Sequence, residues 1–226
     1  MPLLGPDEPA PFETVREQGR SPWVLLCDHA SRRIPRSLSD LGLSEEARAS
    51  HIAWDIGARG VSLRLSEALD APLVACGYSR LVIDANRPLG VPSSIPAVSC
   101  EIPVPGNVGL TAEDEAERAR AIFMPYHAEV ARLLAMRTAR KQPSVLLAMH
   151  SFTPELYGKQ RPWHIGVLSG KDRRLAEVLL AELAKEDDWT VGDNEPYRVS
   201  DVSDYAVPVH GEQAGRLAVL IELRQD

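Results

Sequence analysis

Four apolar runs in this sequence end in side chains that can carry chemistry. His29 closes "WVLLCDH", Asp84 closes "RLVID", His150 follows "LLAM", and Glu222 lies inside "LIELR". In open α/β sheets, ligands bind beyond the carboxyl ends of the strands. A single polar residue at a strand end is ordinary surface chemistry, but four of them in one chain predict a shared site.

Two histidines and a carboxylate from separate segments are the ligand set of a catalytic zinc that keeps one position open. His29 and His150 supply the histidines, and we favour Asp55 in "HIAWDIGA" over Asp28, which could instead orient a histidine ring. The spacing of His51 and Asp55 predicts that they share a helix face. The apolar neighbours of Asp55 predict that it is partly buried and needs a metal or an arginine as its partner. The sequence therefore predicts a divalent metal, with zinc as the first choice.

Other residues in these runs fit a base and a substrate. Glu222 is an acid embedded in an apolar strand, where desolvation makes a carboxylate more basic, so we expect a general base. Asn86 and Arg87 suit a substrate carboxylate, because a guanidinium binds a carboxylate through two parallel hydrogen bonds. Arg80 and Asp84 would alternate on one strand face, where the arginine could pair with a carboxylate inside the pocket. We therefore count Arg80 among the substrate-binding residues.

Three further side chains are considered for the site. His210, in the loop "VHGEQAG", is either an electrophile for the scissile carbonyl or an exposed residue. Tyr197, in "DNEPY", is a candidate pocket residue that would donate to a developing oxyanion. Cys27 close to His29 hints at a thiol nucleophile, but neighbouring strand residues point to opposite faces, so Cys27 should point away from Asp28 and into the core. The HExxH, GxSxG, P-loop and GxGxxG motifs do not occur.

The elements that must position these residues alternate between strand and helix, which predicts a three-layer αβα sandwich with a mostly parallel, mixed sheet. The expected strands are 23–27, 72–76, 80–84, 144–149, 164–168 and 217–223. The expected helices are 44–69, 112–140 with an interruption at Pro125, and 172–186. Residues 88–108 and 192–215 are expected to be irregular, and residues 1–20 to form a surface arm on a single domain spanning 1–226.

Composition narrows the classes of function. The chain has 226 residues, 44% of them hydrophobic, with a net charge of −7, which fits one core and disfavours a nucleic-acid partner. The sequence contains no apolar run of membrane-spanning length and no signal-like start, so we expect no membrane association. The three cysteines have no CxxC spacing, which favours a reducing cytoplasm. The oligomeric state is not predicted.

The chain resembles the N-formylglutamate amidohydrolase family from about residue 22 to 226. The resemblance rests on "CDHASRRIP", "HIAWDIGA", "YSRLVIDANRPL", "HSFTP", "RPWHIGVL", "DNEPY" and "HGEQAGRLAVLIELRQD" in this order. It implies a metal-dependent hydrolase that splits an N-formyl or related N-acyl amino acid, releasing formate and glutamate in the reaction that gives the family its name, a step of histidine degradation.

The resemblance also implies a distant likeness to zinc carboxypeptidases of the phosphorylase-like fold and to aspartoacylase. In those enzymes an Asn-Arg pair holds the substrate carboxylate and a strand glutamate activates water, which matches Asn86-Arg87 and Glu222. This chain departs from that wider group at Arg32, where an acid would be the third metal ligand.

Two other functions are compatible with these motifs. One is a metallo-amidase or peptidase that acts on a larger, peptide-like substrate. The other is a non-catalytic binding protein that has kept the fold. The presence of His29, His150 and Glu222 together argues against the loss of catalysis.

Overall fold

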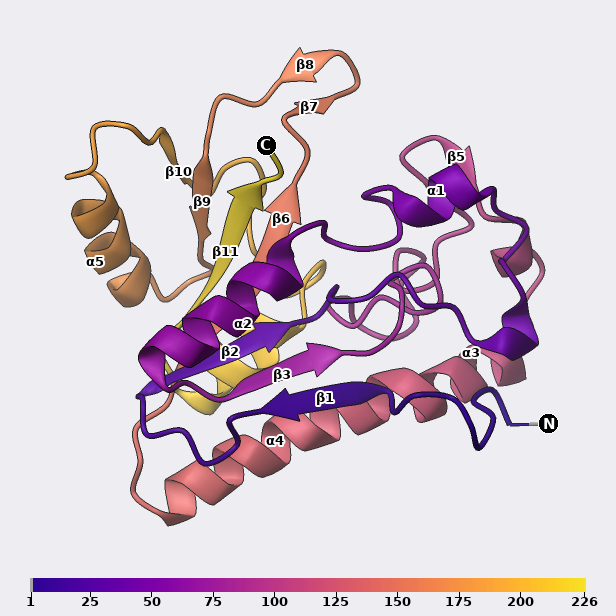
Figure 1. Cartoon of the computed structure of the whole chain (residues 1–226), viewed down its shortest axis with the longest axis horizontal. Helices are drawn as coiled ribbons and strands as arrows, with labels where there is room; N and C mark the ends of the chain where they lie inside the picture. Colours follow the sequence, from indigo (N-terminus) through magenta and orange to yellow (C-terminus); the bar gives the residue numbers. More distant parts are fainter. Residues whose placement is uncertain (1) are drawn as a thin grey trace.

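A seven-stranded sheet forms the centre of the computed structural model, which describes residues 2–226 (Figure 1). Its strands, in spatial order, are β1 (Phe12–Val15), β3 (Leu73–Cys76), β2 (Trp23–Cys27), β6 (Val145–Phe152), β11 (Ala218–Arg224), β9 (Ile165–Leu168) and β10 (Val191–Asp193). The neighbouring strands β3, β2, β6 and β11 run parallel. The pairs β1–β3 and β11–β9 are antiparallel, whereas β9 and β10 run parallel. The mostly parallel, mixed sheet predicted from the apolar runs is therefore confirmed.

Helices cover both faces of this sheet. They are α1 (Glu45–Ala49), α2 (Ala58–Leu69), α3 (Ala112–Arg118), α4 (Met124–Ala139) and α5 (Arg174–Leu183). Shorter turns of 3-10 helix span Arg36–Leu38, Pro105–Asn107 and Glu212–Ala214, and π-helical turns span Ala119–Phe123 and Ala206–Gly211. In Figure 1 the long helix α4 runs along the sheet near β1, while α5 lies beside β9 and β10.

Alternating side chains of one strand show how the core divides into two layers. Val24 and Leu26 of β2 pack in a core that includes Tyr126 and Val130 from α4. Leu25 and Cys27 pack on the other face, with residues of α2 and α5. Because both faces are covered, the central strands carry continuous apolar runs rather than alternating ones. Cys27 lies in this second core, as expected, and burial raises the pKa of its thiol far above the usual range.

Three expectations about the elements were wrong. Residues 80–84 do not form a strand: residues 81–84 are buried, but the backbone turns, with Val82 N–H donating to Ser79 O over 3.0 Å. The helix expected over 44–69 is broken into α1 and α2, and the turn between them holds residues 50–57. The surface arm 1–20 contains Phe12–Val15, which pairs with β3 as an edge strand.

The two regions expected to be irregular contain only short elements; region 192–215 overlaps the end of β10 and includes the turns Ala206–Gly211 and Glu212–Ala214. The proline-rich segment 88–108 forms only the short hairpin β4 (Val98–Ser99) and β5 (Ile102–Pro103) besides its 3-10 turn. A second hairpin, β7 (Glu155–Leu156) and β8 (Lys159–Gln160), extends beyond the end of β6 (Figure 1). Pro125 interrupts the long helix as expected, since it follows a π-helical turn at the start of α4. Across residues 2–226, no helix has both the length and the apolar character needed to span a membrane.

Candidate active site

The strand ends bring together residues that are far apart in the sequence. His29 lies just beyond β2, and His150 lies in the neighbouring parallel strand β6. Glu222 in β11 is directly opposite His150 in the strand register. Asp55 reaches the same point because its backbone N–H donates to the carbonyl of His29 over 3.0 Å. Parallel strands thus present their polar residues at one edge, as the sequence predicted.

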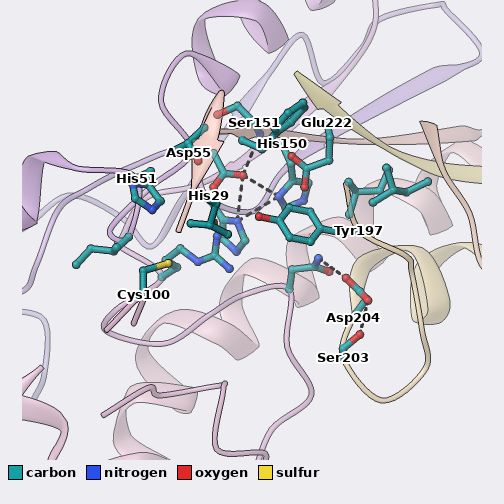
Figure 2. Close-up of a pocket in the computed structure, with 18 of the residues that line it drawn as sticks. His29, His51, Asp55, Cys100, His150, Ser151, Tyr197, Ser203, Asp204 and Glu222 are labelled. Atoms are coloured by element: carbon teal, nitrogen blue, oxygen red, sulfur yellow. Dashed lines mark hydrogen bonds and ion pairs between the residues drawn. The ribbon is translucent and has the colours of Figure 1, made fainter. Parts of the chain in front are cut away.

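His29, Asp55 and His150 converge on one buried point (Figure 2). The two Nδ1 atoms are 3.1 Å apart, and Oδ2 of Asp55 lies 3.2 Å from Nδ1 of His29 and 2.9 Å from Nδ1 of His150. Ligand atoms of a tetrahedral zinc, each bound at about 2.0–2.1 Å, are roughly 3.3 Å apart. The three donor atoms therefore have nearly the spacing that a zinc ion requires.

The other nitrogen of each ring is held by a second carboxylate. Nε2 of His29 lies 2.7 Å from Oδ1 of Asp84, and Nε2 of His150 lies 3.1 Å from Oδ2 of Asp28. A carboxylate at Nε2 keeps the proton there and leaves the Nδ1 lone pair for a metal, the usual arrangement around metal-bound histidines. Asp28 therefore orients His150 rather than taking part in the group of three donors.

The carboxylates around the two histidines accept hydrogen bonds from Arg80 and Tyr126. Arg80 donates to Oδ2 of Asp84 over 2.8 Å and to Oδ1 of Asp55 over 3.3 Å. The hydroxyl of Tyr126 donates to Oδ1 of Asp28 over 2.7 Å. Burial acts to raise the pKa of Asp84, but Arg80 and His29 hold it far below its ordinary value. Asp84 is thus fixed as an anion, and the pairing of Arg80 with a carboxylate of the pocket is as expected.

The environment of the histidines favours a positive charge between them. Burial acts to lower the pKa of His150, but its hydrogen bonds with Asp28 and Asp55 raise it well above the usual value. The same carboxylates stabilise any cation at this point, whether a proton or a metal ion. The donor set is therefore suited to a divalent cation.

Glu222 differs from the other acids of the site because it has no fixed partner. It is 7% exposed, lines the pocket, and its Oε2 atom accepts no hydrogen bond within residues 2–226. Burial raises its pKa to about 7, against the lowering effect of His150. A buried carboxylate with a free oxygen is able to take up a proton near neutral pH.

These groups line a pocket of about 420 Å³, a size suited to a small molecule. Its wall also includes His51, Arg80, Asn86, Arg87, Cys100, Ser151, Phe152, Arg161, Tyr197, Arg198, Ser203 and Asp204. His51 lies in the turn before α2, not on a helix face with Asp55 as expected.

Asn86 and Arg87 lie at the pocket wall and also secure the segment after residue 200. Oδ1 of Asn86 accepts from the backbone N–H groups of Tyr205 and Ala206, each over 3.0 Å, and its Nδ2 donates to Asp204 over 3.1 Å. Arg87 donates to the carbonyl of Ser203. Each side chain still has N–H groups free for a ligand in the pocket.

Tyr197 and His210 have different surroundings. Tyr197 lines the pocket, and its hydroxyl accepts a hydrogen bond from Arg161 over 2.8 Å. His210 is buried outside the pocket wall, with its Nε2 atom 2.9 Å from Nδ1 of His127. The structure thus gives His210 neither of its expected positions, beside the scissile carbonyl or exposed on a loop.

Sequence patterns did not assign a role in the site to three residues that support it. Tyr126 and His127 lie in the long helix α4, where they look like ordinary core positions. Arg161 lies in the motif "RPWHIGVL", where it could be assigned only to packing. Each residue acts through a partner distant in the sequence, which a local pattern does not reveal.

An α/β sandwich with a desolvated glutamate beside a His-Asp-His group is compatible with a hydrolytic enzyme. The sequence model of the family described as N-formylglutamate amidohydrolase matches residues 21–226. The chain belongs to this family, and is accordingly a hydrolase that acts on an amide bond.

Individual relatives agree with this assignment. The chain is 30% identical to the N-formylglutamate deformylase of Pseudomonas putida, over 92% of this chain and 82% of that protein. The crystal structure of a gene product from Agrobacterium tumefaciens has a TM-score of 0.96 and 37% identity, and the match covers 99% of this chain and 88% of that one. The N-formylglutamate amidohydrolase of Ralstonia eutropha has the same fold, with a TM-score of 0.69 at 20% identity, covering 96% of this chain and 86% of that one.

Proposed function

We propose that this protein hydrolyses an N-formyl amino acid, with N-formyl-L-glutamate as the first candidate, and that the reaction uses a divalent metal, preferably zinc. The observation that supports a metal is the convergence of three donor atoms, one each from His29, Asp55 and His150, within 3.2 Å of one another. A metal held there would supply Lewis-acid polarisation of the amide carbonyl and would make a water molecule more acidic.

Glu222 is the general base of this proposal. Its free Oε2 atom takes a proton from the attacking water, whose oxygen forms the new bond to the formyl carbon. The C–N bond then breaks, and Glu222 returns the proton to the leaving amine nitrogen. The carboxylate is thereby regenerated, and the products are formate and the free amino acid.

The remaining pocket residues position the substrate. Asn86 and Arg87 bind the α-carboxylate through their free N–H groups. The hydroxyl of Tyr197 accepts from Arg161 and keeps its own proton for the developing negative charge on the carbonyl oxygen. Arg80 is engaged with Asp84 and Asp55, so we assign it to holding these carboxylates rather than the substrate. We assign no catalytic role to His210.

The two alternative functions fit the structure less well. A pocket of about 420 Å³ matches a small N-acyl amino acid better than a long peptide. The buried Glu222 carboxylate has an oxygen without a hydrogen-bond partner, which destabilises the fold. A non-catalytic binding protein would gain nothing that offsets this loss of stability. The cysteines, all free, are compatible with a reducing compartment, and we place the enzyme in the cytoplasm.

The test is an assay of purified protein whose metal content has been measured. We expect about one zinc per chain and the release of formate and free amine from N-formyl-L-glutamate, with slower release from N-acetyl-L-glutamate, because a larger acyl group must fit beside the buried donors. Metal-loaded protein that releases no amine from any N-acyl amino acid would contradict the proposal.

A further inference from the structure

Three arginines are more than nine-tenths buried, and two of them serve the fold. Arg118 is 2% and Arg137 is 1% exposed. Their acceptors are Val82 O, Gly106 O and Asn107 Oδ1 for Arg118, and Gly19 O, Ser21 O, Pro143 O and Ser144 Oγ for Arg137. Three hydrogen bonds from Arg118 and four from Arg137 thus go to the backbone and neighbouring side chains, so neither guanidinium needs a ligand.

Arg161 is the third of these arginines, and its donors are not satisfied in this way. It is 9% exposed, lines the pocket, and its side chain donates only to the hydroxyl of Tyr197 within residues 2–226. No carboxylate described by the structure lies within 4.0 Å of its guanidinium. A buried charge without a counter-charge is destabilising, so this position favours an anion.

The guanidinium is held in place before any ligand arrives. Its Cζ atom lies 5.1 Å from the ring centroid of Tyr197 and 5.7 Å from that of Phe152. The backbone is fixed as well, because Arg161 N–H donates to Pro154 O over 2.8 Å and Arg224 donates to Arg161 O over 3.1 Å. A rigid, planar fork with free N–H groups is a receptor for a carboxylate.

His51 and Arg80 line the same pocket as Arg161, and neither supplies it with an anion. Burial lowers the pKa of His51, and Arg161 and Arg80 lower it further, so this histidine remains neutral. Its Nε2 atom is buried and has no hydrogen-bond partner within residues 2–226. Arg80 already has its carboxylates, and Arg198, which also lines the pocket, is exposed to solvent. Among residues 2–226, Arg161 is therefore the buried cation of the pocket wall that lacks an anion.

We propose that Arg161 is the specificity residue that receives a second, distal carboxylate of the substrate and so selects acidic N-acyl amino acids. This inference rests on the proposed function, in which Asn86 and Arg87 hold the α-carboxylate. With one carboxylate receptor already assigned to Arg87, the free guanidinium of Arg161 provides another. A substrate with a neutral side chain of the same size would leave Arg161 buried without a counter-charge. The enzyme should therefore hydrolyse such a substrate less efficiently than an acidic one.

The test compares substrates that differ only in this charge, N-formyl-L-glutamate and N-formyl-L-glutamine. We expect Arg161→Gln to lower kcat/KM for the glutamate substrate by about 10- to 100-fold, the range of a lost charged hydrogen bond, and to change it little for the glutamine substrate. Arg33→Gln is the matched control, because Arg33 is an exposed arginine stacked 5.7 Å from the ring centroid of Tyr78 and does not line the pocket. A glutamate-to-glutamine ratio that stays at the wild-type value in Arg161→Gln would overturn the proposal.

Direct binding separates this proposal from the proposed function. L-Glutamate and L-glutamine are titrated into metal-loaded wild type and Arg161→Lys, and the thermal melting temperature of each variant is recorded. We expect the wild type to prefer glutamate and the lysine variant, which keeps the charge but loses the fork, to retain part of this preference. If the wild type cleaves neither N-formyl substrate, the proposed reaction is wrong. Equal binding of glutamate and glutamine by the wild type would instead show that the assignment of Arg161 is wrong.

Discussion

Two buried acids of the pocket show how their partners decide their chemistry. Asp84 receives hydrogen bonds from Arg80 and lies 2.7 Å from His29, which keep it ionised and fixed. Glu222 is equally enclosed but has a carboxylate oxygen without a partner, and burial raises its pKa to about 7. Because their environments separate the two pKa values, Asp84 stays ionised and holds its partners in place, whereas Glu222 can bind and release a proton near neutral pH.

Glu222→Gln tests this assignment because it keeps the shape and removes the basicity. We expect kcat to fall by about 10²–10⁴, the usual contribution of general acid–base catalysis, with zinc content and melting temperature near the wild-type values. Glu129→Gln is the control: Glu129, on α4, is also buried but lies outside the pocket wall, and it accepts from Thr14 of β1 and from Arg132. Loss of zinc in Glu222→Gln would make Glu222 a ligand, and a normal kcat would exclude it from the mechanism.

At the scale of elements, the apolar runs predicted burial better than backbone conformation. The central strands β2, β3, β6, β9 and β11 were predictable because they are covered on both faces. The run 80–84 is equally buried but not extended, since its backbone N–H groups bond to Ala53 O and Ser79 O in place of a neighbouring strand. Strand β1 was missed because an edge strand of partly exposed residues gives a weak signal.

The candidate site was predictable to the extent that its residues lie at strand ends. His29, His150 and Glu222 follow from that rule, and the burial of Asp55 followed from its apolar neighbours. The partner of each residue was not predictable, because hydrogen bonds such as Tyr126 to Asp28 join positions 98 residues apart. A loop histidine such as His210 gives no local sign of whether it faces the pocket or the core.

His127 and His210 form such a hidden contact between two elements. Nε2 of His127 donates to the carbonyl of Ala85 over 2.8 Å, which leaves its Nδ1 atom to accept from His210. The contact joins α4 to the π-helical turn Ala206–Gly211 and reaches the segment that carries Asn86. Burial lowers the pKa of His210 to about 4, and His127 lowers it as well. The folded state therefore favours the neutral form of His210.

This lowered pKa predicts a pH dependence of stability. Between the unfolded value of 6.5 and the folded value of about 4, the unfolded chain binds more protons, so the free energy of unfolding falls as the pH falls through this range. From pH 7.5 to pH 5 the loss due to His210 is about 2 kcal/mol. Urea unfolding of His210→Asn, which keeps an N–H donor, should show a smaller loss over this range than the wild type. Equal losses would show that His210 is not responsible.

At the scale of the whole molecule, the His-Asp-His group joins segments that are distant in the sequence. His29 and Asp55 are 26 residues apart, and Asp55 and His150 are 95 residues apart. A metal bound to all three would connect the end of β2, the turn before α2 and strand β6. An ion that binds only the folded chain stabilises it by mass action, about 2.7 kcal/mol when its free concentration is 100 times the dissociation constant.

Removal of the metal should therefore lower the melting temperature without unfolding the chain. Dialysis against a chelator leaves the two hydrophobic cores intact, and the carboxylates around His29 and His150 can still pair with protonated imidazoles. For a chain of this size we expect a decrease of about 5–10 °C that added zinc reverses. His29→Asn removes one donor, so its melting temperature should not respond to the chelator or to zinc. If wild type and His29→Asn respond alike, any zinc that stabilises the fold is bound elsewhere on the molecule.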